Sequence, residues 1–123
     1  MASVVVTNDV IDIRFTGWER LWTGRDQLVL RLAAVRRVDL VNDPLRLARG
    51  ARRGYVVSGF TKIGVWGLFG GPRQLVAVRR AESGVHLVLD RPAGGGEFDE
   101  VVLSSPTAPG IVATIKRSMA AHQ

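Results

Sequence analysis

The sequence of 123 residues predicts a mainly β protein, an antiparallel barrel or split barrel that a C-terminal helix caps. Three observations predict this fold. Short runs of β-branched and aromatic residues follow one another along most of the chain, as strands require. Turn-forming residues, such as Ser83 and Gly84 or those at 92–96, separate these runs at close spacing. Residues 105–123 instead place apolar side chains at a helical period.

The strand candidates number about nine, which is typical of a barrel or sandwich. At 10–15 the residues Val10, Ile11, Ile13 and Phe15 alternate with Asp12 and Arg14 in large part, which indicates a half-buried strand. Comparable runs of strand length lie at 27–32, 74–80, 85–90 and 98–103.

Residues 59–72, GFTKIGVWGLFGGP, contain five glycines among large apolar side chains and one lysine. A membrane span over 54–72 is disfavoured, because Lys62 near its middle costs about 3 kcal/mol on insertion. Glycines contribute almost no apolar area to offset that cost. A transmembrane helix is therefore not expected here.

The same stretch is not a phosphate-binding loop. Gly59 and Gly64 have the spacing of the two glycines of a Walker A motif, but Val65 and Trp66 stand where lysine and a hydroxyl residue are needed. Short β strands remain, VVSGF at 56–60 and VWGLF at 65–69, in which the glycines mark bulges, bends or a close approach of backbones.

The closing segment, SPTAPGIVATIKRSMAAHQ, predicts an amphipathic helix with two alternative starts. Ser105 could cap it with Pro106 at the first helical position, or Thr107 could cap it. Pro109 favours Thr107, because a missing N–H matters less early in the first turn.

Apolar residues at i, i+4 and i+8 of this helix, namely Ile111, Ile115 and Met119, form one stripe. We expect that stripe to cover the open end of the barrel, with binding of a partner helix as the alternative. Lys116 and Arg117 are expected near the negative end of the helix dipole.

Two shorter helical turns are predicted. Trp18, Leu21 and Trp22 share one face of a turn bounded by glycines, and we expect that face to pack on the sheet. At 43–50, Asp43 can cap a turn that begins with Pro44.

The composition predicts one domain over residues 1–123 and excludes several functions. The chain has no cysteine, which removes disulfides and thiolate chemistry. Residues 1–10 carry no basic segment and include Asn8 and Asp9, so no signal peptide is predicted and a cytoplasmic location is expected.

Basic residues are concentrated in the middle of the chain. Residues 31–80 hold 11 of the 17 Lys and Arg but two acids, within a formal net charge of +6. Such asymmetry is typical of proteins with anionic partners. The excess of arginine over lysine in a chain rich in Ala, Val and Gly also fits a high-GC genome with no ligand at all.

The order of segments resembles the bacterial pleckstrin-homology-like (PH-like) domain, in its small stand-alone actinobacterial form. A strand, a short helix and then LVLRLAAVRRVDL precede a connector and a glycine-containing segment, as in that family. The matching residues are Leu30, Leu32, Val35, Val38, Asp43, Pro44, Arg49, Gly50, Thr61, Gly64, Val65, Gly67 and Phe69. The family's proline, Pro-Gly and threonine positions are replaced by Ala33, Ile63-Gly64 and Gly67-Leu68-Phe69. The resemblance implies a PH-like barrel with a C-terminal helix and no agreed catalytic residues.

The titratable residues do not predict an enzyme, and no cofactor or metal is expected. His86 lies within a strand run and His122 near the end of the chain, and no nucleophile or acid has a recognisable spacing to either. Asp90, Glu97, Asp99 and Glu100 lack the spacing of a calcium loop and are expected in a solvated turn.

We therefore expect a binding or scaffold module whose partner is a protein or an anionic lipid headgroup. Arginine's planar fork suits phosphate and carboxylate. The alternative is non-specific nucleic-acid binding, which the absence of a recognition motif disfavours. An unpaired strand edge would also favour pairing with a second copy of the chain. The candidate anion patch comprises Arg46, Arg49, Arg52, Arg53, Lys62 and Arg73.

Overall fold

The computed structural model describes residues 3–7, 9–42, 44, 52–57, 61–67, 73–79, 82–90 and 98–121, of which the side chains of Trp18, Leu21, Trp22, 52–57 and Thr61 are not described. These residues form nine strands and two α-helices, with one 3₁₀ turn between β3 and β4. The strands are β1 (Ser3–Val6), β2 (Val10–Arg14), β3 (Gln27–Arg31), β4 (Val35–Val41), β5 (Arg52–Val57), β6 (Thr61–Trp66), β7 (Gln74–Arg79), β8 (Gly84–Leu89) and β9 (Glu100–Ser104). The helices are α1 (Trp18–Thr23), α2 (Ala108–Ala121) and the 3₁₀ turn η1 (Leu32–Ala34).

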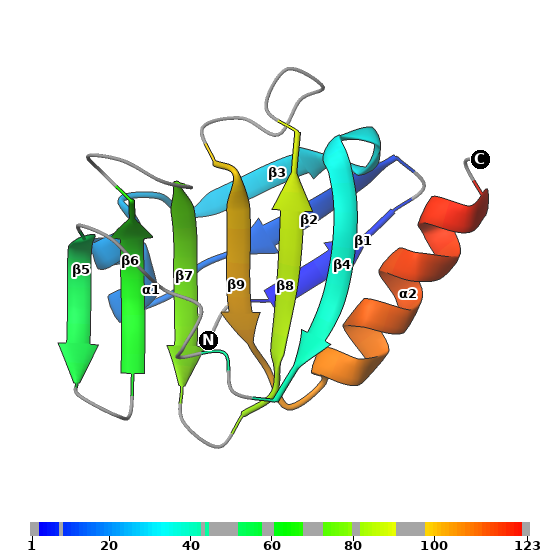
Figure 1. Cartoon of the computed structure of the whole chain (residues 1–123). Coiled ribbons are helices and arrows are strands. Elements are labelled where there is room, and N and C mark those ends of the chain that lie inside the picture. Colours follow the sequence, from blue (N-terminus) through cyan, green and yellow to red (C-terminus); the bar gives the residue numbers. More distant parts are fainter. Residues whose placement is uncertain are drawn as a thin grey trace.

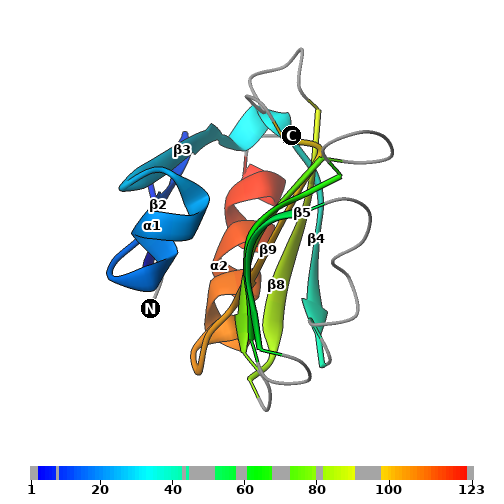
Figure 2. The same cartoon turned by 90° about the vertical axis from the view of Figure 1, so that its left-hand side faces the viewer.

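The strands form two sheets, ordered β1-β2-β3 and β4-β8-β9-β7-β6-β5. Figure 1 shows the six-stranded sheet in front of the three-stranded one, and Figure 2 shows the two layers edge-on. The expected mainly β fold with a C-terminal helix is confirmed. Among the described strands no pairing joins the two sheets, so they form two layers and not a closed barrel.

One strand pair departs from the antiparallel pattern that we predicted. β9 lies between β8 and β7 and runs antiparallel to β8 but parallel to β7. All other described pairs are antiparallel. The reason is connectivity, because β9 enters between two strands that are consecutive in the chain.

The main core lies between the two sheets. Ile11, Ile13 and Leu30 from the smaller sheet are fully buried against residues such as Leu75 and Val101 of the larger one. The alternate positions of β7 are buried as well, on the outward face, where Val76 and Val78 cluster with Trp66 and Val102. Burial on both faces explains why β7 reads as a continuous apolar run.

The corner between β3 and β4 connects the two sheets. η1 turns the chain after β3, and β4 begins in the other sheet. A register shift between Val35 and Arg37 marks an irregularity just after the corner. The register across Gly64 is uninterrupted, so this glycine of β6 does not mark a bulge.

Helix α2 begins at Ala108, so Thr107 is the residue just before it. The Thr107 carbonyl accepts the first helical bond, from the Ile111 N–H at 3.1 Å, and the Thr107 N–H donates to Ser105 Oγ at 3.1 Å. The helix therefore begins where the second prediction placed it, whereas the side chain that accepts a main-chain N–H at this end is that of Ser105. Pro106 precedes the helix, and Pro109 is its second residue, where no N–H donor is needed.

The buried side of α2 closes the open side of the two-layered sheet, beside β1 and β4 (Figure 1). Ile115 of the predicted stripe is fully buried, whereas Ile111 and Met119 are partly buried and Val112 takes a core position. The helix continues to Ala121, so Lys116 and Arg117 lie before its last turn and not within it.

Helix α1 packs against β5, β6 and β7. The predicted glycine boundaries are confirmed: Gly17 precedes the helix and Gly24 ends it in the left-handed conformation with φ of 73°, which glycine adopts without strain. The predicted packing face of Trp18, Leu21 and Trp22 lies outside the described side chains.

The remaining sequence predictions agree in part. β5 and β6 begin earlier than the runs that we predicted, and β1 was not predicted as a strand. Phe69 and most of the predicted turn at 43–50 lie outside the described residues. Within the described part of the chain, no helix has the length and apolar character needed to cross a bilayer.

Candidate functional site

The six residues of the candidate anion patch are only partly placed. Arg46 and Arg49 lie outside the described residues. Arg52 and Arg53 begin β5, where they pair with Trp66 and Val65 of β6.

The strand register brings Arg52 and Arg73 to one end of the larger sheet. Trp66, which pairs with Arg52, also pairs with Gln74, and Arg73 immediately precedes Gln74. Lys62 lies four residues from Trp66 along β6, about 13 Å at the usual rise of a strand. The backbone therefore places three of the six positions, Arg52, Arg53 and Arg73, at one end of the sheet and holds Lys62 away from them.

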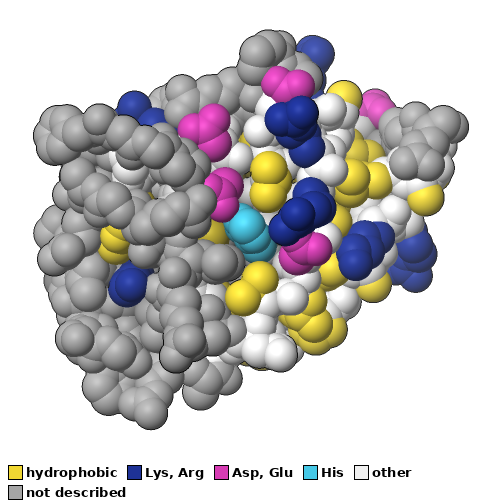
Figure 3. Space-filling model, viewed as in Figure 1, with side chains coloured by type: hydrophobic (Ala, Val, Ile, Leu, Met, Phe, Trp, Pro, Cys, Tyr) yellow, Lys and Arg dark blue, Asp and Glu magenta, His cyan; other side chains and the backbone are white. Residues whose placement is uncertain are grey.

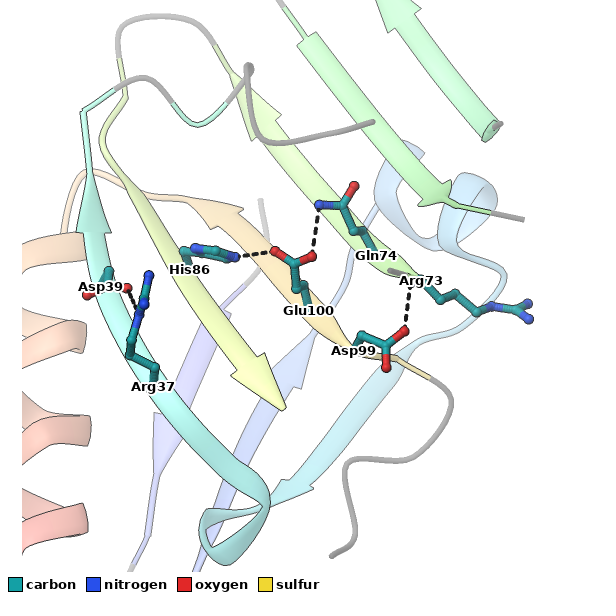
Figure 4. Close-up of polar contacts among 7 residues, drawn as sticks. All are labelled: Arg37, Asp39, Arg73, Gln74, His86, Asp99 and Glu100. Carbon is teal, nitrogen blue, oxygen red and sulfur yellow. Dashed lines mark hydrogen bonds and ion pairs between the residues drawn. The ribbon is translucent and has the colours of Figure 1, made fainter. Parts of the chain in front are cut away.

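A row of polar side chains crosses the outward face of the larger sheet (Figure 4). His86 Nε2 lies 2.6 Å from Glu100 Oε1, and Gln74 Nε2 donates to Glu100 Oε2 at 3.5 Å. All three residues are buried, with exposed fractions of 9% or less. The location of His86 in a strand is confirmed, whereas the expected solvated turn at Glu100 is wrong, because this residue begins the buried strand β9.

This row continues at both ends. Asp39 of β4 pairs with His86 in the sheet register, and Arg37 Nε lies 2.6 Å from Asp39 Oδ2. At the other end, the Arg73 N–H donates to Asp99 Oδ2 at 2.8 Å, while the Arg73 side chain points away from Glu100 (Figure 4). Figure 3 shows charged side chains of both signs mixed with hydrophobic ones on this face. The contacts of the row join donors to acceptors, except that the buried Nε of Arg73 has no hydrogen-bond partner.

A different feature has the shape of a binding site, a groove of about 270 Å³ between β1 and α2. Apolar and small side chains line it: Val4, Val6, Thr107, Gly110, Ile111 and Thr114. The helical members recur at i, i+3, i+4 and i+7, so they form one face of α2. That face is shared between the core and the groove, and this accounts for the partial burial of Ile111.

Strand β1 contributes its free edge to the groove. It is the outermost strand of its sheet and pairs only with β2 among the described strands. The Thr7 N–H donates to the Val10 carbonyl at 3.0 Å. Because hydrogen-bonded and non-hydrogen-bonded residue pairs alternate along an antiparallel pair of strands, this bond determines which residues of β1 bond to β2. The main-chain groups of Val5 therefore point to β2, and those of Val4 and Val6 point to the open side.

The helix side of the groove is open at Gly110. A Cβ atom at this position would have no atom within 4 Å. One turn further along α2, Arg117 Nη2 donates to the hydroxyl of Thr114 at 3.3 Å. The groove thus has an apolar floor, main-chain groups of β1 that no described strand pairs with on one wall, and the Arg117 guanidinium beside the other.

A second hollow of about 570 Å³ lies at the end of α1 and is lined by Gly17, Arg20, Gly24, Arg25 and Asp26. Its charges are largely matched. Arg20 Nε lies 2.6 Å from Asp26 Oδ1, and Arg25 stacks on the Phe98 ring at 5.0 Å from the centroid. We therefore assign it no ligand.

The groove was not predicted from the sequence. A signal exists in α2, where Thr107, Gly110, Thr114 and Arg117 place small and polar residues along a face next to the apolar stripe. The strand side carries no such signal, because which main-chain groups of β1 are free depends on pairing with β2.

The described side chains include no cluster of three His, Cys, Asp or Glu residues that would hold a metal ion. The geometry of the groove is therefore the main guide to function. No family model, no curated protein and no solved structure matches the chain.

Proposed function

We propose that this chain is a non-enzymatic binding module whose ligand is an extended segment of a protein partner. The segment adds to the free edge of β1 as a fourth strand and rests its side chains on α2. The observation that carries the proposal is the coincidence of that edge with an apolar groove at Val4, Val6 and Ile111.

Main-chain pairing supplies part of the affinity. The N–H and C=O groups of Val4 and Val6 match an incoming strand, and each hydrogen bond contributes about 0.5–1.5 kcal/mol net. β1 has the sequence SVVV, with no lysine, proline or bulge of the kind that blocks pairing at edge strands.

Side chains of the ligand supply the rest of the affinity. The groove volume of about 270 Å³ suits one or two apolar side chains better than a large cofactor. Gly110 leaves the space above the helix free, so an incoming β-branched residue can lie against Ile111.

The arrangement is also consistent with the PH-like split barrel that the sequence resembles, and we propose that assignment for the fold. Two packed sheets with a C-terminal helix on their open side support it. The parallel β7–β9 pair and the six-stranded sheet are departures from it.

The test is selection of random octapeptides displayed on phage, using the wild-type chain, followed by affinity measurement with labelled peptides. Gly110→Leu fills the groove and should lower affinity at least about tenfold, while better helix propensity keeps the fold intact. Ala120→Leu adds the same side chain at an exposed position of α2 outside the groove and should bind as wild type does.

Strand addition makes a second, independent requirement. Alternate residues of an added strand point their N–H groups toward β1 or away from it. Methylating the backbone nitrogens of the residues that face β1 should abolish binding, and methylating those of the intervening residues should leave binding unchanged. Equal binding by the Gly110→Leu and wild-type chains, or tolerance of both methylation patterns, would overturn the proposal. Binding to phosphatidylserine vesicles that Gly110→Leu does not reduce would instead favour the basic patch.

A further inference from the structure

One charged side chain, that of Arg117, lies beside the groove and contacts a residue that lines it. α2 holds two cations, Lys116 and Arg117, and no acid. Arg117 bonds to Thr114, whose side chain lines the groove, whereas Lys116 lies on the opposite side of the helix from the groove-lining residues.

Most of the N–H donors of the Arg117 guanidinium remain available to a ligand. No carboxylate of the described residues lies within ion-pair distance of it, and its side chain is exposed. Three other exposed arginines pair with carboxylates, Arg14 with Asp12, Arg20 with Asp26 and Arg37 with Asp39, whereas Arg31, Arg36 and Arg79 resemble Arg117 in having no carboxylate of the described residues at ion-pair distance. What distinguishes Arg117 is its bond to Thr114, which lines the groove. A guanidinium has five N–H donors, of which the Thr114 hydroxyl uses one.

We infer that the peptide bound in this groove carries a carboxylate that pairs with Arg117. The carboxylate belongs either to an Asp or Glu side chain or to the peptide's C-terminus, since both present the same two oxygens to the guanidinium fork. This inference rests on the proposed function and names the chemistry of its ligand.

The position of Arg117 beside the groove explains why its pairing with a carboxylate would contribute to binding. An added strand on β1 would shield the Thr114 side of Arg117 from water, and screening of a charge pair weakens as water is excluded. An isolated pair on an open helix surface would contribute little.

The probes are octapeptides obtained from selection on the wild-type chain and prepared in three forms. The first carries Glu and an amidated C-terminus, the second has Gln in place of Glu, and the third has Gln and a free C-terminal carboxylate. The proteins are the wild-type chain, Arg117→Gln, Arg117→Glu and Lys116→Glu. The last is the matched control, because it makes the same change of charge one residue away from Arg117.

We expect wild type to prefer the first or third form by about tenfold over the second, as a charge-assisted hydrogen bond allows. The form that binds tighter identifies the source of the carboxylate. Arg117→Gln should lose the preference, Arg117→Glu should reverse it in favour of the second, uncharged form, and Lys116→Glu should behave as wild type.

Two failures are distinguishable. If wild type binds all three forms equally, or if Arg117→Glu keeps the wild-type preference, the carboxylate inference is overturned while the groove proposal stands. If selection on wild type yields no peptide that Gly110→Leu discriminates, both are overturned.

Discussion

His86 of β8 and Glu100 of β9 meet across neighbouring strands at a diagonal, with 2.6 Å between Nε2 and Oε1. Their direct partners in the register are different residues, Val102 and Val88. Gln74 of β7 binds the other carboxylate oxygen, so one buried carboxylate connects three adjacent strands.

Removing that carboxylate should destabilise the protein. In Glu100→Ala the buried His86 side chain loses its Glu100 partner and Gln74 loses one contact, and a buried group left unsatisfied costs about 1–3 kcal/mol. Urea unfolding of Glu100→Ala, His86→Ala and the double variant forms a double-mutant cycle. A coupling free energy below about 0.5 kcal/mol would show that the two side chains do not interact.

Gly84→Ala should destabilise the protein through a steric clash. A Cβ atom at Gly84 would lie 2.6 Å from Pro44 Cβ and 3.3 Å from the Leu103 carbonyl oxygen. Overpacking of this kind costs about 1–3 kcal/mol, and the ring of Pro44 cannot rotate away. Thermal unfolding measures the effect; a melting temperature equal to that of wild type would contradict the contact between Gly84 and Pro44.

Gly110→Ala should have the opposite effect. This glycine lies within α2 at an exposed position where an added Cβ meets no atom within 4 Å. Replacing glycine by alanine in a helix gains up to about 1 kcal/mol. Chemical denaturation should therefore show higher stability, and a loss of stability would mean that the position is strained or filled.

Trp66→Ala should be the most damaging single truncation on the outward face. Trp66 is 3% exposed and belongs to the cluster with Val76, Val78 and Val102. Truncation of a buried tryptophan costs roughly 3–5 kcal/mol. The control is Leu40→Ala, because Leu40 is 44% exposed and its loss should stay within about 0.5 kcal/mol.

Local sequence signals predicted the elements better than their arrangement. The end of α2 near Thr107 was predictable because proline and hydroxyl residues act within a single turn. The bounds of α1 were predictable for a similar reason, since Gly24 ends the helix in a conformation that few other residues adopt.

The polar row and the groove depend on register between segments far apart in the chain. His86 and Glu100 are separated by 14 positions, and they meet only because β9 pairs with β8 in one particular register. Similarly, the free groups of Val4 and Val6 follow from the β1–β2 hairpin, and their neighbour Gly110 comes from the other end of the chain. Periodicity does not encode such pairings, because a strand's pattern specifies its buried face and not its partner.

The position of β9 sets the order in which the larger sheet can be completed during synthesis. β8 bonds to β4 on one side, and β7 bonds to β6 on the other, but the two halves share no pairing until β9 enters between them. Translation proceeds at about 5–20 residues per second, so β8, which ends at Leu89, leaves the ribosome roughly 0.5–3 s before residues 100–104 do. Each half then has an unpaired edge that only the late strand covers, and chains interrupted before residue 100 keep both edges open to other nascent chains.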